Sequence, residues 1–130
     1  MTKGLIYLIC PVRNASEHEK RVLDRYVRRM ENQGYEVHYP PRDVNQNDPT
    51  GMNICAHHRS AIWDCTEIRA VWNPESKGSL FDFGMAWLAQ KPFRLANKRR
   101  IENWLNDPKH SGKSYERVAY ELHKYYEAKS

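Results

Sequence analysis

A chain of 130 residues is long enough to bury a substantial core, and we expect residues 1–130 to form a single domain. Apolar residues make up 40% of the chain and charged residues 28%, a balance typical of globular proteins. No apolar stretch reaches the roughly 18 residues that a membrane span requires, so we expect no membrane partner. The formal net charge of +5 favours anionic ligands in general, but it does not select nucleic acid, which we do not expect as a partner.

The cysteines bear on the cellular compartment. Cys10, Cys55 and Cys65 are odd in number and show no Cys-x-x-Cys spacing, which predicts reduced, buried thiols rather than a disulfide framework. The apolar run near the N-terminus is too short for a signal peptide. We therefore expect a cytoplasmic protein.

The first predicted strand is the continuous apolar run of residues 4–10, which suits a strand buried on both faces of a parallel sheet. Pro11 ends it, because proline cannot donate to a strand ladder. Ser16 and Glu19 then have the spacing of a capping box and predict the start of a helix. That helix carries an apolar stripe and is expected to end at Gly34.

A second, short strand is predicted by the alternating residues 35–39, and Pro40-Pro41 is expected to stop it. Residues 42–51 form a polar stretch that we interpret as a long loop. A second helix is predicted over 52–66, followed by a third strand over 67–73.

The second half of the chain continues the alternation. A loop at 73–77 leads to a third helix over 79–90, and 91–95 is predicted to be a fourth strand. A short helix at 101–106 and a turn-rich linker follow. Alternating strands and helices with short connections predict a three-layer α/β sandwich, flavodoxin-like or Rossmann-like, with a parallel sheet of four to five strands.

The last predicted helix, residues 114–128, carries an aromatic stripe that we interpret as a packing face. The stripe comprises Tyr115, Val118, Ala119, Leu122, Tyr125 and Tyr126.

Several familiar chemistries lack their signatures in the sequence. His57 and His58 are adjacent, so on a helix they point about 100° apart and do not share a metal ion. The chain has no Gly-x-Ser-x-Gly elbow, no Gly-x-Gly-x-x-Gly motif and no Walker loop. We therefore expect neither a metal site nor a cofactor.

The most informative stretch is Lys77-Gly-Ser-Leu-Phe-Asp-Phe-Gly-Met-Ala86, which follows a predicted strand and places one acid, Asp82, in the first turns of a helix. Ligands of open α/β sheets bind at the carboxyl ends of strands, where such turns lie. A carboxylate in a partly closed pocket can act as a nucleophile in glycosyl transfer. The amides of Gly78 and Ser79 and the Ser79 hydroxyl can bind a phosphate or a sugar hydroxyl. The alternative is an ordinary early-helix acid that satisfies nearby N–H groups.

Residues 78–86 resemble the core motif of the nucleoside 2-deoxyribosyltransferase-like family, which includes deoxynucleoside 5′-monophosphate N-glycosidases. That motif runs Gly-Thr/Ser-x-x-Glu-x-Gly-x-Ala, and the chain matches it at every position but one. Ile6-Tyr7-Leu8 followed by Pro11 is similar to the first strand and loop of the family. Arg13-Asn14 is similar to the arginine-containing loop of the monophosphate hydrolases. Residues 62–71 with Asn73-Pro74 are similar to the family's helix–strand lead-in, so the resemblance covers roughly residues 4–95.

The chain departs from the family pattern at three places. Asp82 stands where the family has glutamate, which sets the carboxylate back by ~1.5 Å; displacements of that size can cost about a hundredfold in rate. Ser76 stands where the family often has a base-binding aspartate, and Glu75 beside it can substitute only through a small shift of the loop. Residues 57–59, His-His-Arg, stand where the family has an acid that contacts the sugar.

The resemblance implies a set of site residues. Asp82 is the expected nucleophile, Tyr7 its orienting partner and Arg13 a ligand of the 5′-phosphate. The other expected substrate-binding residues are Asn14, His58, Arg59, Asn73, Gly78 and Ser79. Ordinary alternatives stay open: Tyr7 as a packed strand residue, Arg13 as a solvated loop residue, and His58 with Arg59 as a surface pair.

The expected function is N-glycosidic bond cleavage, or deoxyribosyl transfer, on a nucleoside or nucleoside 5′-monophosphate. We also expect a homo-oligomer, because the family completes its pocket with a neighbouring subunit. One alternative is a non-catalytic nucleotide-binding or sensing module, which the residues at positions 82 and 76 favour. Another is a TIR-like NAD glycohydrolase, since those proteins also use a carboxylate on a flavodoxin-like sheet.

Overall fold

The computed structural model describes residues 2–130. Its four strands form one parallel sheet in the order β2-β1-β3-β4. The strands are β1 (Leu5–Ile9), β2 (Glu36–His38), β3 (Glu67–Ala70) and β4 (Phe93–Leu95). The helices are α1 (Glu17–Asn32), α2 (Pro40–Asp43), α3 (Met52–Asp64), α4 (Lys77–Ala89), α5 (Lys98–Asn106) and α6 (Tyr115–Lys129), with a 3₁₀ turn at Pro108–His110.

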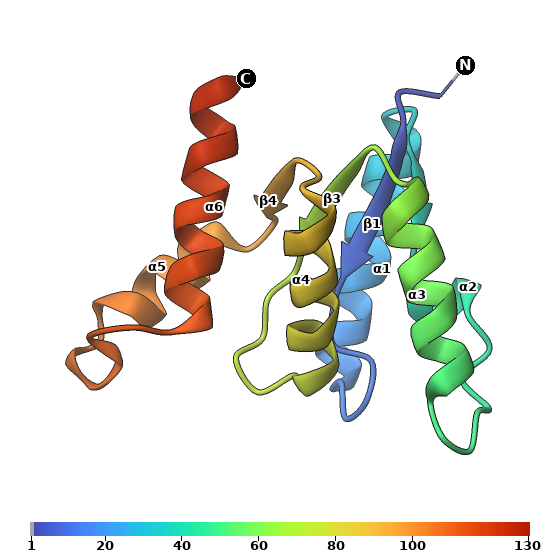
Figure 1. Cartoon of the computed structure of the whole chain (residues 1–130), viewed down its shortest axis with the longest axis horizontal. Coiled ribbons are helices and arrows are strands. Elements are labelled where there is room, and N and C mark those ends of the chain that lie inside the picture. Colours follow the sequence, from blue (N-terminus) through green and yellow to red (C-terminus); the bar gives the residue numbers. More distant parts are fainter. Residues whose placement is uncertain (1) are drawn as a thin grey trace.

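Helices cover both faces of the sheet, which confirms the predicted three-layer sandwich (Figure 1). Side chains of β1 alternate between the two faces, as strand geometry requires. Ile6 and Leu8 pack with the buried side of α1, while Tyr7 and Ile9 belong to a second cluster with residues of α3 and α4. The connections that leave β1 and β3 therefore run to opposite faces, so a topological switch point lies between these two strands.

The N-terminal half follows the sequence expectations closely. Glu19 N–H donates to Ser16 Oγ at 3.1 Å and Ser16 N–H donates to Glu19 Oε1 at 3.2 Å, so the predicted capping box is confirmed. Cys10 and Cys65 are buried, Cys55 is half-buried, and all three are unpaired. Burial raises the pKa of Cys65 to about 11, which keeps this thiol protonated.

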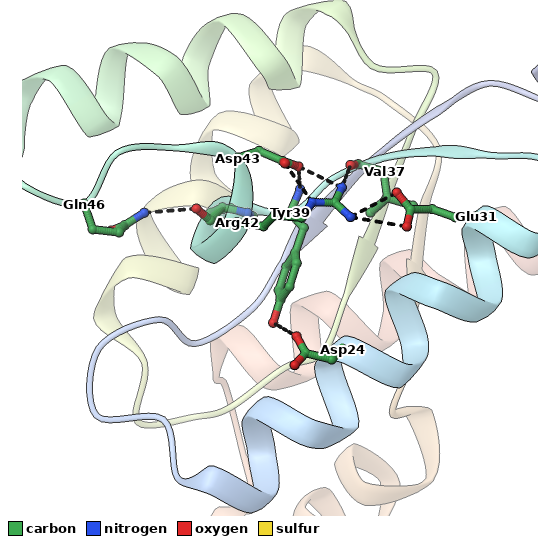
Figure 2. Close-up of polar contacts among 8 residues, drawn as sticks. Asp24, Glu31, Val37, Tyr39, Arg42, Asp43 and Gln46 are labelled. Carbon is green, nitrogen blue, oxygen red and sulfur yellow. Dashed lines mark hydrogen bonds and ion pairs between the residues drawn. The ribbon is translucent and has the colours of Figure 1, made fainter.

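The second strand ends before Pro40-Pro41 as expected, but the loop predicted over residues 42–51 begins later than predicted. Residues Pro40–Asp43 form the short helix α2, in which proline occupies the first turn and its missing N–H costs nothing. Asp43 accepts a hydrogen bond from Tyr39 N–H at 2.8 Å. Arg42 donates to Asp43, to Glu31 on α1 and to the carbonyl of Val37, and these contacts fix the turn (Figure 2).

The packing face predicted for the last helix is confirmed only in part. Ala119, Leu122 and Tyr126 pack against the core. Tyr115 and Tyr125, in contrast, are 61% and 52% exposed, and the polar residues Glu116 and His123 are buried. The polar side chains turn inward because they satisfy buried donors. Trp72 Nε1–H donates to Glu116 Oε2 at 2.8 Å, and the N–H of Leu95 on β4 donates to His123 Nδ1 at 2.8 Å.

The remaining differences concern boundaries and connections. Helix α4 begins two residues earlier than predicted and α5 three residues earlier. A 3₁₀ turn occupies part of the predicted linker. Between residues 2 and 130, no helix is both long and apolar enough to cross a bilayer.

The His123 contact predicts a pH-dependent stability. Burial lowers the pKa of His123 below its ordinary value of 6.5, against the opposing pull of Glu127. The neutral ring accepts the Leu95 N–H. The contribution of His123 to the free energy of unfolding is complete above pH 6.5. It is lost as the pH falls below that value, because the unfolded chain then binds the proton more readily than the folded one. Urea unfolding between pH 5 and 7.5 measures this loss.

The control variant is His123→Asn, whose amide oxygen can accept the same N–H but does not titrate. Its free energy of unfolding should fall less steeply with decreasing pH than that of the wild type. Equal slopes for the two proteins would contradict this account of the α6 contact.

Candidate functional site

Helix α4 places its one carboxylate on the buried side. Ser76 caps the helix, and its Oγ accepts the Ser79 N–H at 3.2 Å. Asp82 lies one and a half turns further along and is only 5% exposed. It faces β1 and α3 across the interior, where a buried acid needs partners.

Both carboxylate oxygens of Asp82 have a partner. Tyr7 O–H donates to Asp82 Oδ2 at 2.8 Å, and His58 Nδ1 lies 3.1 Å from Asp82 Oδ1. The three residues come from α4, β1 and α3, and each is at most 8% exposed. Burial, followed by the negative charge of Asp82, raises the pKa of Tyr7 far above its usual value, so the phenol stays protonated and remains a donor.

A second histidine completes this buried cluster. The ring of His38 stacks on Tyr7 with centroids 5.2 Å apart and an interplanar angle of 16°. The ring of His58 meets Tyr7 edge-on at 5.9 Å. Nε2 of both histidines is buried without a hydrogen-bond partner. Burial lowers the pKa of His38, which favours its neutral form. We call Tyr7, His38, His58 and Asp82 the buried acid cluster.

The pairing of Tyr7 with Asp82 is the arrangement that the sequence predicted, but His38 was not anticipated. The feature that brings His38 to the site is the register of the sheet, because Tyr7 and His38 are direct partners in the parallel β1–β2 pair. His38 alternates with Val37, which packs toward α1. The position of the last residue of such a short strand is known only once the register is known.

The predicted sugar-binding pair on α3 is split by the structure. His58 points inward against Asp82, whereas Arg59 is exposed, as is His57. The interpretation of His58 as half of a surface pair was therefore wrong. Three consecutive residues on a helix point in different directions, and only His58 lies on the buried side.

Some of the hydrogen-bond donors at the start of α4 already have partners within the protein. The N–H of Ser79 is taken by the cap, and Ser76 Oγ–H donates to Ser79 Oγ at 2.9 Å. We had expected the amide of Ser79 to bind a ligand, but Ser79 is only 2% exposed, so its amide does not face one. Gly78 is exposed in the first turn of α4.

The predicted phosphate loop lies at the surface, whereas Asp82 is buried. Arg13 and Asn14 are exposed after β1, and Asn14 adopts a left-handed conformation with φ 58°. Asn73 ties the β3–α4 loop to the first turn of α1: its amide donates to Glu19 Oε2 at 3.3 Å, and its oxygen accepts the N–H of Glu75 in the same loop at 2.9 Å.

A cavity of about 820 Å³ opens beside Asn73 at the carboxyl edge of the sheet. Its walls come from α1, the β3–α4 loop and α5, and include Glu19, Arg100 and Trp104. Asp82 does not line it. Across the described part of the chain, no group of three or more histidine, cysteine, aspartate or glutamate side chains is placed to hold a metal ion.

Comparisons with known proteins bear on the fold. No protein-family model matches the chain, and no curated protein matches it. Among solved structures, the CMP N-glycosidase BcmB of Clostridium botulinum is similar, with a TM-score of 0.53 and 23% sequence identity. The match covers 70% of this chain and 66% of that one, so the chain spans about two thirds of its neighbour's length. A likeness at this identity supports the α/β sandwich architecture.

Loss of the Tyr7 hydroxyl should destabilise the protein. Tyr7→Phe leaves Asp82 Oδ2 buried without its donor, so we expect the free energy of unfolding to fall by about 1–3 kcal/mol. The matched control is Tyr39→Phe, whose hydroxyl donates to the exposed Asp24 at 2.9 Å. Water can replace that bond, so the control should lose less than about 1 kcal/mol. Urea denaturation compares the two, and equal losses would contradict a special role for the buried bond.

Proposed function

We propose that this protein cleaves the N-glycosidic bond of a nucleoside 5′-monophosphate or nucleoside, with Asp82 as the nucleophile. The observation that carries the proposal is the buried hydrogen bond between Tyr7 and Asp82. It holds a carboxylate at the start of the helix that follows β3, in the stretch that resembles the glycosyl-transfer motif. The fold likeness to a CMP N-glycosidase supports the same reaction class.

The chemistry assigned to Asp82 proceeds in two steps. A carboxylate oxygen attacks C1′ of the sugar as the C1′–N bond breaks, and the base leaves with the electron pair and takes up a proton from solvent. Water then attacks C1′ and gives up one proton to solvent. The bond between C1′ and the Asp82 oxygen breaks, its electron pair returns to the carboxylate, and the free sugar leaves. A second base in place of water gives deoxyribosyl transfer.

Tyr7 orients the nucleophile in this proposal. The Tyr7 hydroxyl fixes Oδ2, so the attacking lone pair is presented by Oδ1, where His58 now lies. Because Asp82 is only 5% exposed, substrate entry requires His58 to withdraw and α3 to separate from α4. Arg13 and Asn14, exposed after β1, are the proposed ligands of the phosphate, with Gly78 at the start of α4; Arg59 and Asn73 are assigned to the rim of the site.

Free base should be released from at least one member of a panel of deoxynucleosides, their 5′-monophosphates and CMP, as followed by liquid chromatography. Asp82→Asn keeps the size of the side chain but removes the nucleophile, and it should lower the rate by about a thousandfold or more. The control is Asp64→Asn, an exposed acid at the end of α3, which should leave the rate unchanged. Base release that survives in Asp82→Asn would refute the proposed role.

A second candidate is a nucleotide-binding module without turnover. The specific observation in its favour is that both oxygens of Asp82 are occupied inside the fold. Calorimetry would then detect nucleotide binding while no base is released. Asp82→Glu restores the side-chain length found in the family that the chain resembles. Base release that appears only in this variant would favour the second candidate.

A third candidate is NAD glycohydrolase activity, which the release of nicotinamide from NAD would decide.

Cytoplasmic location and self-association remain predictions that accompany the proposal. The proposed substrate is a small molecule, and the proposed reaction requires no cofactor.

A further inference from the structure

Helix α1 carries a stripe of arginines on its outer side. The stripe comprises Arg21, Arg25, Arg28 and Arg29, and all four are exposed. On a helix these positions cover an arc of about 100°, and the centre of the arc lies nearly opposite the buried side of α1. We call these four residues the arginine stripe.

The acids in the middle and at the end of α1 do not neutralise the arginine stripe. Asp24 and Glu31 point instead toward the turn around α2 (Figure 2). Asp24 Oδ1 accepts the Tyr39 hydroxyl at 2.9 Å, and Glu31 Oε2 lies 3.1 Å from Arg42 Nη1. The contacts that fix α2 against α1 therefore use the negative charge of this part of the helix.

The two acids of the first turn of α1 also have other partners. Glu17 pairs with Lys20 at 3.3 Å, and Glu19 accepts the N–H of Ser16 and the side-chain amide of Asn73. Between residues 2 and 130, no carboxylate lies within 4.0 Å of a guanidinium of the arginine stripe. Four positive charges thus stand together on one side of one helix.

The arginine stripe leads into a cavity with an aromatic wall. His18, one turn before Arg21, lines the cavity of about 820 Å³ at the carboxyl edge of the sheet. Arg100 and Trp104, one turn apart on α5, line the same cavity. His110 stacks on the Trp104 indole with ring centroids 3.7 Å apart and an interplanar angle of 5°, which holds the indole in one orientation.

A base fits this cavity better than a phosphate does. Trp104 is half-buried, so its indole can contact a second planar ring besides His110. Glu19 and Glu75 also line the cavity, and their carboxylates repel a phosphate. Proteins that bind single-stranded nucleic acid combine the same two elements, cations that follow the backbone and an aromatic side chain on which an unpaired base stacks.

We propose that this face of the protein binds single-stranded nucleic acid, with the backbone along the arginine stripe and an unpaired base against Trp104. From position 21 to position 29 the stripe is about 12 Å long. One strand in helical geometry carries a phosphate about every 3.4 Å, so about four phosphates match the four arginines. The binding does not depend on the reaction proposed for Asp82, which does not line the cavity.

The distribution of charge and apolar surface favours this ligand. The net charge of +5 alone does not select nucleic acid, whereas the gathering of unpaired arginines on one side of a helix does. A helix that lies on a membrane needs an apolar face beside its cations. On α1 the one large apolar side chain that is exposed is Val22, at 38%.

Fluorescence anisotropy with a labelled oligothymidylate of about 12 nucleotides tests the proposal on the whole chain, since single-strand sites span about 4–16 nucleotides. At 0.1 M salt the wild type should bind with a dissociation constant of about 1–100 μM. Neutralisation of four phosphates should give a slope of about −2.8 when the logarithm of the association constant is plotted against that of the salt concentration.

The double variant Arg25→Gln with Arg28→Gln should halve that slope and weaken binding about twentyfold at 0.1 M salt. The matched control is Lys124→Gln with Lys129→Gln, which removes the same charge from the exposed side of α6 and should leave both values unchanged. Glutamine is a good helix former, so thermal unfolding of both double variants should match the wild type. Equal weakening by the two would indicate attraction to net charge alone and would overturn the proposal.

A second ligand isolates the contact with the base. An abasic strand of the same length and charge should bind at least about fivefold more weakly than oligothymidylate, because it has no base to stack on Trp104. Equal affinity for the two strands would overturn the proposal. So would a wild type that does not bind oligothymidylate, even one that binds phosphatidylserine vesicles or poly-glutamate.

Discussion

The hydrogen bond from Tyr7 to Asp82 is the interaction on which the interior of this protein depends. It joins the central strand β1 to α4 at 2.8 Å, in a place where an acid without partners would strongly oppose folding. His58 supplies the second contact from α3, and His38 supports the Tyr7 ring from β2. Four separate elements thus meet at one carboxyl group. A polar cluster built into the core in this way is better explained by chemistry than by stability, since apolar residues could fill the space more simply.

The same cluster accounts for the unusual character of α4. Because Ser79 and Asp82 take the inner side, the apolar residues of this helix are left partly outside. One helix therefore has two unusual faces, a polar one toward the sheet and an apolar one toward solvent. In our account the inner face serves a reaction.

The sequence was sufficient for the features that depend on local pattern. Alternating apolar runs identified the parallel α/β sandwich, and Ser16 and Glu19 marked the start of α1. The contact between Tyr7 and Asp82 spans 75 residues and was implied by the family resemblance. It failed where long-range contacts decide. His38 reaches the site only through strand register, and α6 turns Glu116 and His123 inward because Trp72 and β4 present buried donors. No periodicity of the helix itself contains that information.

The most direct test of the central claim is a crystal structure of the Asp82→Asn variant with a deoxynucleoside 5′-monophosphate bound. The account predicts that His58 withdraws, that the nucleotide enters between α3 and α4, and that the residue-82 side-chain oxygen lies about 3–3.5 Å from C1′. A nucleotide bound at another place, with Tyr7 and His58 still closed over residue 82, would contradict it.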